Sequence, residues 1–200
     1  NGNLDQSGLT NSHATIRIPT SGKWFFELTV QEQTNGFVCG ITALSNPATP
    51  NNSTAIAIAE NGARYNGDGT RTNSFLSAFV VGDVLGVAID QDNNTINFYR
   101  NGQAGGSTLQ PSPLGTDLVP VVHTNATKVN FNFGQKAFKH PLAGYKSLWT
   151  TNLPEPSIPI PSQYFDAKVY SGSGSARTFD DLSLSPDFVW IKATSDSAGH

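Results

Sequence analysis

The chain of 200 residues is 37% hydrophobic and contains 19 glycines and 12 prolines, so it is long enough for one well-buried domain and a smaller second unit. Its 12 Lys and Arg residues are dispersed and its formal net charge is -3 at pH 7, which argues against a nucleic-acid partner. No apolar run approaches the roughly 20 residues that cross a bilayer, and we expect no membrane insertion.

Short apolar or alternating segments, separated by turn-rich stretches, predict a chain of β-strands with almost no helix. In chain order the expected strands are His13–Ile18, Trp24–Val30, Phe37–Ala43, Ala55–Ala59, Arg64–Tyr65, Val84–Ile89, Ile96–Tyr99, Leu118–Val122 and Val129–Phe133. The only cysteine, Cys39, lies in the third of these, cannot form an intrachain disulfide, and is expected to fill core space.

The stretch Gly82–Gly102 is the most informative part of the sequence. Its first strand, Val84–Ile89, is apolar on both faces and should therefore lie in the middle of a sheet. Its second strand, Ile96–Tyr99, alternates apolar and polar residues, and Gln91–Asn94 supplies residues that tolerate a tight turn. The stretch predicts a β-hairpin with a central first strand.

Three further segments around this hairpin resemble, in order, the strands of SPRY domains, β-sandwich interaction modules found in many eukaryotic proteins and in phage particles. They are Ser21–Val30 (SGKWFFELTV), Phe37–Ala43 (FVCGITA) and Leu118–Phe138, which contains LVPVV and VNFNFGQKAF. The resemblance implies an all-β fold, a SPRY-like (concanavalin-like) antiparallel β-sandwich that binds through its loops without catalysis.

A proline-rich stretch marks the end of this unit. Four prolines in Asn152–Ser162 (NLPEPSIPIPS) favour an extended connector, because proline cannot donate to a strand ladder. We expect a SPRY-like sandwich over 1–150, a Pro-rich extended linker over 151–163, and the beginning of a second β-rich domain, cut short at its end, over 164–200. Within the last, strands are expected at Tyr164–Ser171 and Ala176–Lys192.

The segment after the linker carries a second resemblance. The order NLPEP, YFDAKVYSGSGS and LSPDFVWIK is similar to modules in large structural and tail-associated proteins of bacteriophages. This implies a virion location, on a phage tail or particle surface, with an extracellular location as the alternative.

A search for reactive or metal-binding residues gives no catalytic site. Asp90, Asp92 and Asn94 are spaced as in a calcium loop, but the glycine and glutamate that such a loop requires are absent, so a hairpin turn is favoured over an irregular calcium site. No spacing among the carboxylates selects a catalytic pair, and no nucleophile motif is present. The histidines are too scattered for a metal site: His13, His123, His140 and His200. We expect a non-enzyme with no metal and no cofactor.

One loop offers the best candidate for ligand contact. Tyr65 is the aromatic residue best placed to reach a surface, and the polar loop that follows it gives it neighbours for a ligand. The predicted ligand-binding residues are Tyr65, Asn66, Asp68 and Arg71. By strand order, the SPRY resemblance implies binding loops at Gln31–Gly36, Leu44–Ser53, Asn66–Asn73 and Gln103–Thr116.

These observations lead to one main hypothesis. The chain is a non-catalytic binding or structural module of a phage-like virion or tail protein, and its loops recognise neighbouring virion proteins or a host-surface protein or glycan, with homo-oligomerisation left open. The alternative is an accessory carbohydrate-binding domain of a larger polysaccharide-degrading enzyme or adhesin. The lack of a paired-carboxylate motif counts against catalysis within this sequence.

Overall fold

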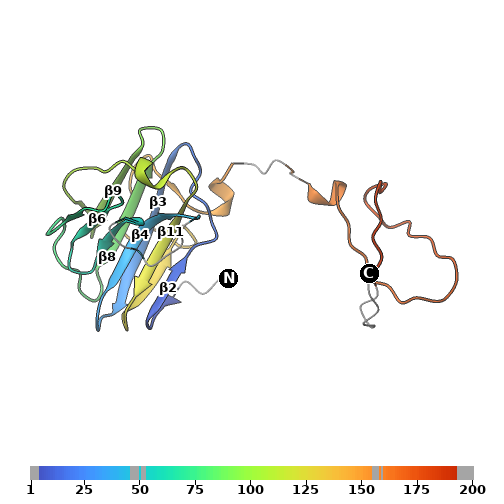
Figure 1. Cartoon of the computed structure of the whole chain (residues 1–200), viewed down its shortest axis with the longest axis horizontal. Helices are drawn as coiled ribbons and strands as arrows, with labels where there is room; N and C mark the ends of the chain where they lie inside the picture. Colours follow the sequence, from blue (N-terminus) through green and yellow to red (C-terminus); the bar gives the residue numbers. More distant parts are fainter. Residues whose placement is uncertain (1–4, 46–49, 51–52, 155–157, 159, 193–200) are drawn as a thin grey trace. The chain divides into compact units, whose positions relative to one another are not determined.

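Alternating apolar residues build two antiparallel sheets that face each other across one core (Figure 1). The computed structural model describes residues 5–45, 50, 53–154, 158 and 160–192. The chain divides into two units, Asn1–Pro154 and Glu155–His200, and all strands of the described residues lie in the first. The all-β sandwich expected from the sequence is therefore confirmed.

The first sheet has seven strands in the order β1-β12-β3-β8-β9-β10, with β13 paired in parallel to β3. Their bounds are β1 (Asp5–Gln6), β3 (Lys23–Glu32), β8 (Val84–Asp90), β9 (Thr95–Arg100), β10 (Gln103–Ala104), β12 (Lys128–Asn132) and β13 (Lys146–Ser147). Every residue of β8 is buried, and the strand lies between β3 and β9 as its apolar faces predicted.

The second sheet has six strands in the order β2-β11-β4-β5-β6-β7. Their bounds are β2 (Thr10–His13), β4 (Phe37–Ala43), β5 (Ala55–Ala59), β6 (Arg64–Asn66), β7 (Arg71–Thr72) and β11 (Leu118–Thr124). The described residues also form three short 3-10 helices, η1 (Ser112–Leu114), η2 (Thr150–Asn152) and η3 (Pro161–Gln163).

The strand predicted at His13–Ile18 is formed earlier in the chain, as β2. Its ladder with β11 pairs Thr10 to His13 with Thr124 to Val121. The next residue, Ala14, still donates its N–H to the Pro120 carbonyl at 2.9 Å, but Pro120 has no N–H to return. The missing donor ends the ladder where the alternation of residues suggested that it begins.

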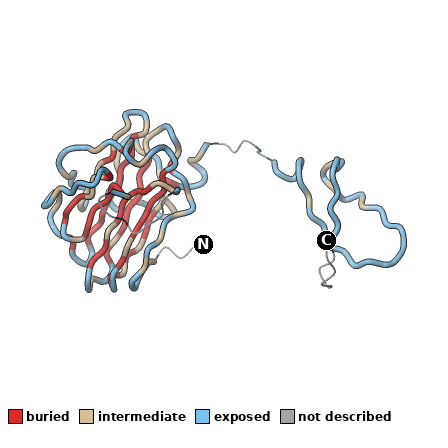
Figure 2. Tube along the Cα trace, in the orientation of Figure 1, coloured by how far each residue is buried: buried red, intermediate tan, exposed pale blue. Residues whose placement is uncertain are grey.

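The core lies between the inner faces of the two sheets, where Figure 2 shows the buried residues concentrated in the strands. Its largest fully buried side chains include Phe26, Phe79 and Phe98. Cys39 is fully buried in the same cluster, which confirms its predicted role, and burial raises the pKa of its thiol far above the ordinary value.

The second unit differs from its expected structure. Among its described residues, 158 and 160–192, only η3 is regular, so the strands expected at Tyr164–Ser171 and Ala176–Lys192 are not formed there. A strand requires a hydrogen-bonded neighbour in register. The described residues of this region instead include surface ion pairs of Lys168 with Asp166 and Asp181.

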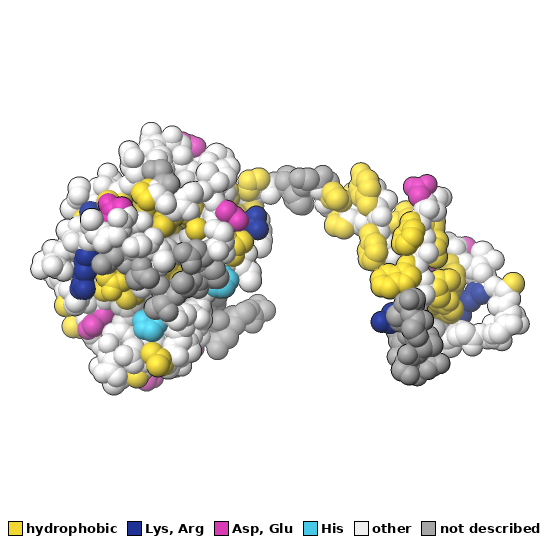
Figure 3. All heavy atoms as spheres, viewed as in Figure 1, with side chains coloured by type: hydrophobic (Ala, Val, Ile, Leu, Met, Phe, Trp, Pro, Cys, Tyr) yellow, Lys and Arg dark blue, Asp and Glu magenta, His cyan; other side chains and the backbone are white. Residues whose placement is uncertain are grey.

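Large apolar side chains of the second unit remain exposed, as the hydrophobic spheres of Figure 3 show. The division after Pro154 falls inside the predicted linker 151–163, of which residues 155–157 and 159 lie outside the described residues. The three domain ranges remain predictions. No helix in the described part of the chain has the length and hydropathy of a membrane span.

Candidate functional site

Tyr65 and Arg71 form a cross-strand pair in the hairpin of β6 and β7. The two residues are directly opposite in register, and the Arg71 guanidinium carbon lies 5.5 Å from the centre of the Tyr65 ring. Arg71 also donates to Asn61 Oδ1 at 3.4 Å, while the half-buried Tyr65 packs against a small cluster that includes Ala57. The hairpin thus presents an aromatic ring and an adjacent cation on the outer face of the second sheet.

Asn66 and Asp68 build the turn of this hairpin. The Asn66 amide donates to the hydroxyls of Thr70 at 2.8 Å and Thr72 at 3.3 Å, and its oxygen accepts from Arg64 Nε at 3.0 Å. Asp68 Oδ1 accepts from the Thr70 hydroxyl at 2.6 Å and from the Thr70 N–H at 2.9 Å. These hydrogen bonds, the hydroxyl first, lower the pKa of Asp68.

The four predicted site residues therefore share one hairpin but have two different environments. Alternation along β6 places Tyr65 with Ala57 on the outer face, while Asn66 is in register with the core residue Ile56. The structure brings the half-buried Tyr65 and the exposed Arg71 together as a pair, and it engages the Asn66 and Asp68 side chains in the turn.

Arg64 anchors this hairpin from the inside, and the sequence analysis did not identify it. Its side chain is buried, with the guanidinium carbon 4.1 Å from the centre of the Phe75 ring and Nη1 donating to the Ser107 carbonyl at 2.6 Å. Burial lowers the pKa of Arg64. The only signal in the sequence was a basic residue at a core-facing position of a short strand.

The four loops predicted to bind do not all lie at one end of the sandwich. Successive strands of an antiparallel sheet run in opposite directions, so the connections before and after β4 lie at opposite ends. The loop Gln31–Gly36 precedes β4, and its Gly36 carbonyl accepts from the Asn125 N–H at 3.0 Å. This loop therefore lies at the opposite end of the sandwich from the other three predicted loops.

The other three predicted loops do meet. The loops Leu44–Ser53 and Asn66–Asn73 lie next to each other, because a Cβ added at Gly69 would be only 3.6 Å from Ser53 Oγ. A Cβ at Gly67 would lie 3.3 Å from Leu114, which belongs to Gln103–Thr116. Residues 46–49 and 51–52 of the first loop lie outside the described residues.

The segment with calcium-loop spacing, Asp90 to Asn94, forms the tight turn between β8 and β9, which the sequence favoured. Asp90 forms an ion pair with Lys23 at 3.0 Å, and hydrogen bonding from Asn93 is the main cause of its lowered pKa. Asp92 Oδ1 accepts from the Gly22 N–H at 2.7 Å. Within the described residues, no three His, Cys, Asp or Glu side chains are grouped to hold a metal ion.

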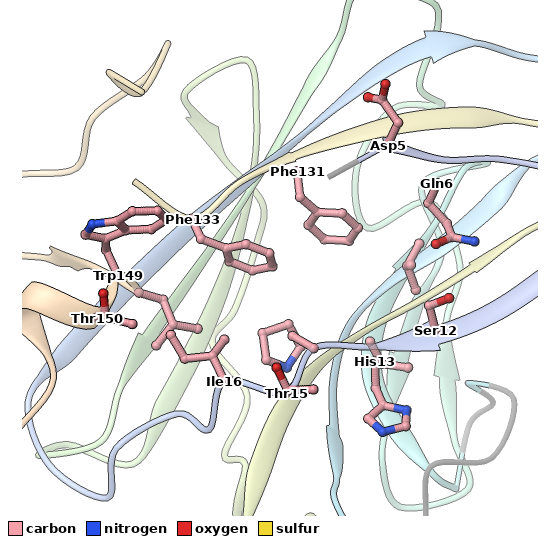
Figure 4. Close-up of a pocket in the computed structure, with 15 residues that line it drawn as sticks. Asp5, Gln6, Ser12, His13, Thr15, Ile16, Phe131, Phe133, Trp149 and Thr150 are labelled. Carbon is pink, nitrogen blue, oxygen red and sulfur yellow. The ribbon is translucent and has the colours of Figure 1, made fainter. Parts of the chain in front are cut away.

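A cavity of about 370 Å³ is a second feature that the sequence analysis missed. It opens at the edge of the sandwich where β1, β2 and the segment 148–150 meet (Figure 4). Its apolar lining includes Ile16, Phe131, Phe133, Leu148 and Trp149. The signal available in the sequence was that the alternate positions before Ile16 carry small residues, Ser12 and Ala14.

Comparison with known proteins decides the family. The family model of the SPRY domain matches residues 23–136. This chain belongs to the SPRY family. A second model, a domain of unknown function named DUF7483, matches residues 160–200. The SPRY match spans the β3 to β12 strands that build both sheets, and SPRY domains are generally protein-interaction modules.

Relatives with curated names are similar over the SPRY region. The E3 ubiquitin-protein ligase RKP of Arabidopsis thaliana is 28% identical over 153 residues, covering 72% of this chain and 12% of the relative. The probable ATP-dependent RNA helicase ddx1 of Dictyostelium discoideum is 28% identical over 134 residues, covering 64% of this chain and 17% of the relative. The chain thus spans less than a fifth of the length of these relatives.

A solved structure agrees with the fold. The SPRY domain of human HERC1 is similar with a TM-score of 0.54 and 20% sequence identity, over 65% of this chain and 86% of that chain. At this identity the similarity supports the sandwich architecture alone.

Proposed function

We propose that this chain is a non-catalytic binding module that recognises a segment of a partner protein through the surface pair of half-buried Tyr65 and exposed Arg71 and the loops around it. SPRY membership supports the protein-binding part of this proposal. The observation that carries the choice of surface is the cross-strand cation–π contact of Arg71 with Tyr65, since an aromatic ring beside a cation is typical of binding hot spots.

The hairpin is built to hold this pair in place. Its turn is fixed by the hydrogen bonds of Asn66 and Asp68, and its inner side is fixed by the buried Arg64. A preorganised surface loses less conformational entropy on binding than a mobile one. Arg71 offers several N–H donors in one plane, which suits carboxylates and carbonyl groups of a partner segment.

For the biological setting, we infer a phage-like virion or tail protein, whose partners are neighbouring virion proteins or a host-surface protein or glycan, with an extracellular adhesin as the alternative. This inference rests on the resemblance of the C-terminal segment to phage modules. The DUF7483 match covers the same segment and carries no function, and neither curated relative named above is a virion protein.

A binding screen tests the proposal. The full chain is applied to a random peptide array and a glycan array, and hits are remeasured with Tyr65→Ala and Arg71→Ala. We expect peptide hits whose affinity falls about tenfold or more in both variants.

The control is Arg17→Ala, which removes an exposed arginine paired with Asp117 at the surface. Peptide binding that is the same in wild type, Tyr65→Ala and Arg71→Ala would contradict the assigned surface. Selective glycan binding without peptide binding would instead support the accessory carbohydrate-binding alternative.

A further inference from the structure

The edge cavity exists because the side chains at this edge do not fill the space between the two sheets. Along β2 and the residue after it, the side chains that face the interior are small, Ser12 and Ala14, while the opposite sheet contributes Phe131 and Phe133. Figure 4 shows the two phenylalanine rings on one side of the space and Ser12 on the other. Large aromatic groups on one wall and short side chains on the other leave room for a guest group.

The walls of the cavity are suited to an aromatic group. The rings of Phe131 and Phe133 are stacked, with centroids 5.2 Å apart and planes 7° from parallel. Trp149, with 39% of its surface exposed, extends this apolar wall to the mouth. Aromatic groups gain from such contact both by area burial and by offset or edge-to-face packing.

The volume defines the size of the guest. An apolar cavity of about 150 Å³ is enough to hold benzene, and ligand sites of about 300 to 1,000 Å³ are common. At about 370 Å³, this cavity holds one phenyl or indole side chain together with part of its backbone. It is too small for a folded element of a partner.

The charge around the mouth defines what should flank that side chain. The lining contains one carboxylate, Asp5, and one histidine, His13, and neither Lys nor Arg. Asp5 lies in β1, next to Asn130, whose amide donates to it at 2.7 Å. Lys136, which is not part of the lining, donates to Asn130 Oδ1 at 2.9 Å. A cationic residue beside the inserted aromatic group would therefore meet a complementary charge, and an anionic residue would be repelled.

The place of the cavity defines the form of the partner. It opens between β1 and β2, which are terminal strands of their respective sheets. Extended segments commonly bind along terminal strands and insert alternate side chains into pockets. We propose that this cavity receives the aromatic side chain of an extended partner-protein segment in which a Lys or Arg flanks the aromatic residue.

The three tryptophans of the chain provide a direct test. The full chain, labelled with 15N, is titrated with the probe acetyl-Lys-Phe-Lys-amide, and the indole N–H resonances are followed by NMR, with Trp149→Phe assigning the reporter. We expect the Trp149 resonance to move. The Trp24 resonance should stay still, because its indole is buried and donates to the Ser21 carbonyl at 2.7 Å.

Two variants block the cavity while keeping the reporter. Ser12→Leu and Ala14→Leu each extend a side chain into the cavity. Each should lower the affinity for the lysine probe about tenfold or more. The matched control is Asn11→Leu, on the exposed side of the same strand, which should leave binding unchanged. An unmoved Trp24 resonance reports that each variant is folded, and one folded blocking variant is enough for the test.

The charge requirement has its own comparison. Acetyl-Glu-Phe-Glu-amide should bind more weakly than the lysine probe, and Asp5→Lys should reverse this order. Acetyl-Lys-Ala-Lys-amide should give no shift. The proposal is overturned if Trp149 does not respond to the lysine probe, if the blocking variants respond like wild type, or if both charged probes bind equally. Tyr65→Ala should not alter this titration, so failure here is distinct from failure of the hairpin surface.

Discussion

At the scale of single residues, an ion pair between the buried Asp83 and the half-buried Arg100 fixes the start of the central hairpin. Asp83 accepts two hydrogen bonds from Arg100, at 2.6 and 2.9 Å, and one from Asn101 at 2.6 Å. The Val80 N–H also donates to it at 2.8 Å. Burial by itself would raise the pKa of Asp83, but the hydrogen bonds from Val80, Asn101 and Arg100 outweigh burial and lower it.

This lowered pKa predicts a pH-dependent loss of stability. Asp83→Asn should reduce the free energy of unfolding by about 1 to 3 kcal/mol at pH 7, because the charged acceptor is lost. The carboxylate stabilises the fold at pH values above its pKa in the unfolded state, which is near 3.8. This stabilisation is lost as the pH falls through the lower pKa of the folded state. Urea unfolding at pH 7 and below pH 3.8 measures the free energy of unfolding of wild type and of Asp83→Asn. The difference between the two should be smaller at the acidic pH.

The control for this measurement is Asp117→Asn, which removes the exposed ion pair with Arg17. It should cost less than about 1 kcal/mol at either pH. A difference between wild type and Asp83→Asn that stays constant with pH would show that the carboxylate charge does not stabilise the hairpin.

The buried Arg64 gives a second prediction at this scale. Arg64→Gln removes the donor to the Ser107 carbonyl and the stacking on Phe75, and should lower the free energy of unfolding by about 2 to 3 kcal/mol. Arg71→Gln, at an exposed position of the same hairpin, should cost less than about 1 kcal/mol. Thermal or urea unfolding of both variants tests whether the hairpin is anchored from inside; equal losses would contradict it.

At the scale of elements, the pairing of β4 with β5 depends on a glycine. Gly40 is opposite Ala57 in register, and a Cβ at Gly40 would lie 2.1 Å from the Ile56 carbonyl oxygen and 2.5 Å from the Ala57 Cα. No side chain fits this space without moving the backbone of β5. The sequence showed a glycine inside an apolar strand, but only the pairing shows what it approaches.

Gly40→Ala should therefore destabilise the fold by more than about 2 kcal/mol through forced separation of the two strands. Gly106→Ala is the matched control, because a Cβ there would meet Phe75 at an ordinary 3.5 Å. Chemical denaturation of the two variants makes the comparison. A Gly40→Ala variant as stable as Gly106→Ala would show that the sheet adjusts freely at this point.

At the scale of the whole molecule, the sandwich core is built by the first unit. Among the described residues, the members of its main buried cluster all belong to this unit, as does Leu153, which packs against it. Residues 1–154 should thus unfold cooperatively, with a midpoint within about 2 °C of the same transition in the full chain. Calorimetry of both forms tests this, and a large loss of stability on truncation would show that the core depends on residues after 154.

Much of this architecture was determined by the sequence itself. Local alternation of apolar and polar residues set most strands of the sandwich, and the hairpin around Gln91–Asn94 followed from turn residues, because these preferences act between near neighbours. The position of Tyr65 and Arg71 near a turn could be predicted for the same reason. Their cation–π contact could not, since it depends on the register of β6 against β7.

Only the tertiary structure decided the remaining features. The end of β2 at His13 depends on which residue of β11 lies opposite, and the cavity depends on small residues of one sheet facing Phe131 and Phe133 of the other. The anchoring role of Arg64 likewise depends on a loop more than forty positions away. A sequence specifies the residues that alternate along a strand, whereas contacts between distant segments are fixed by how the two sheets pack.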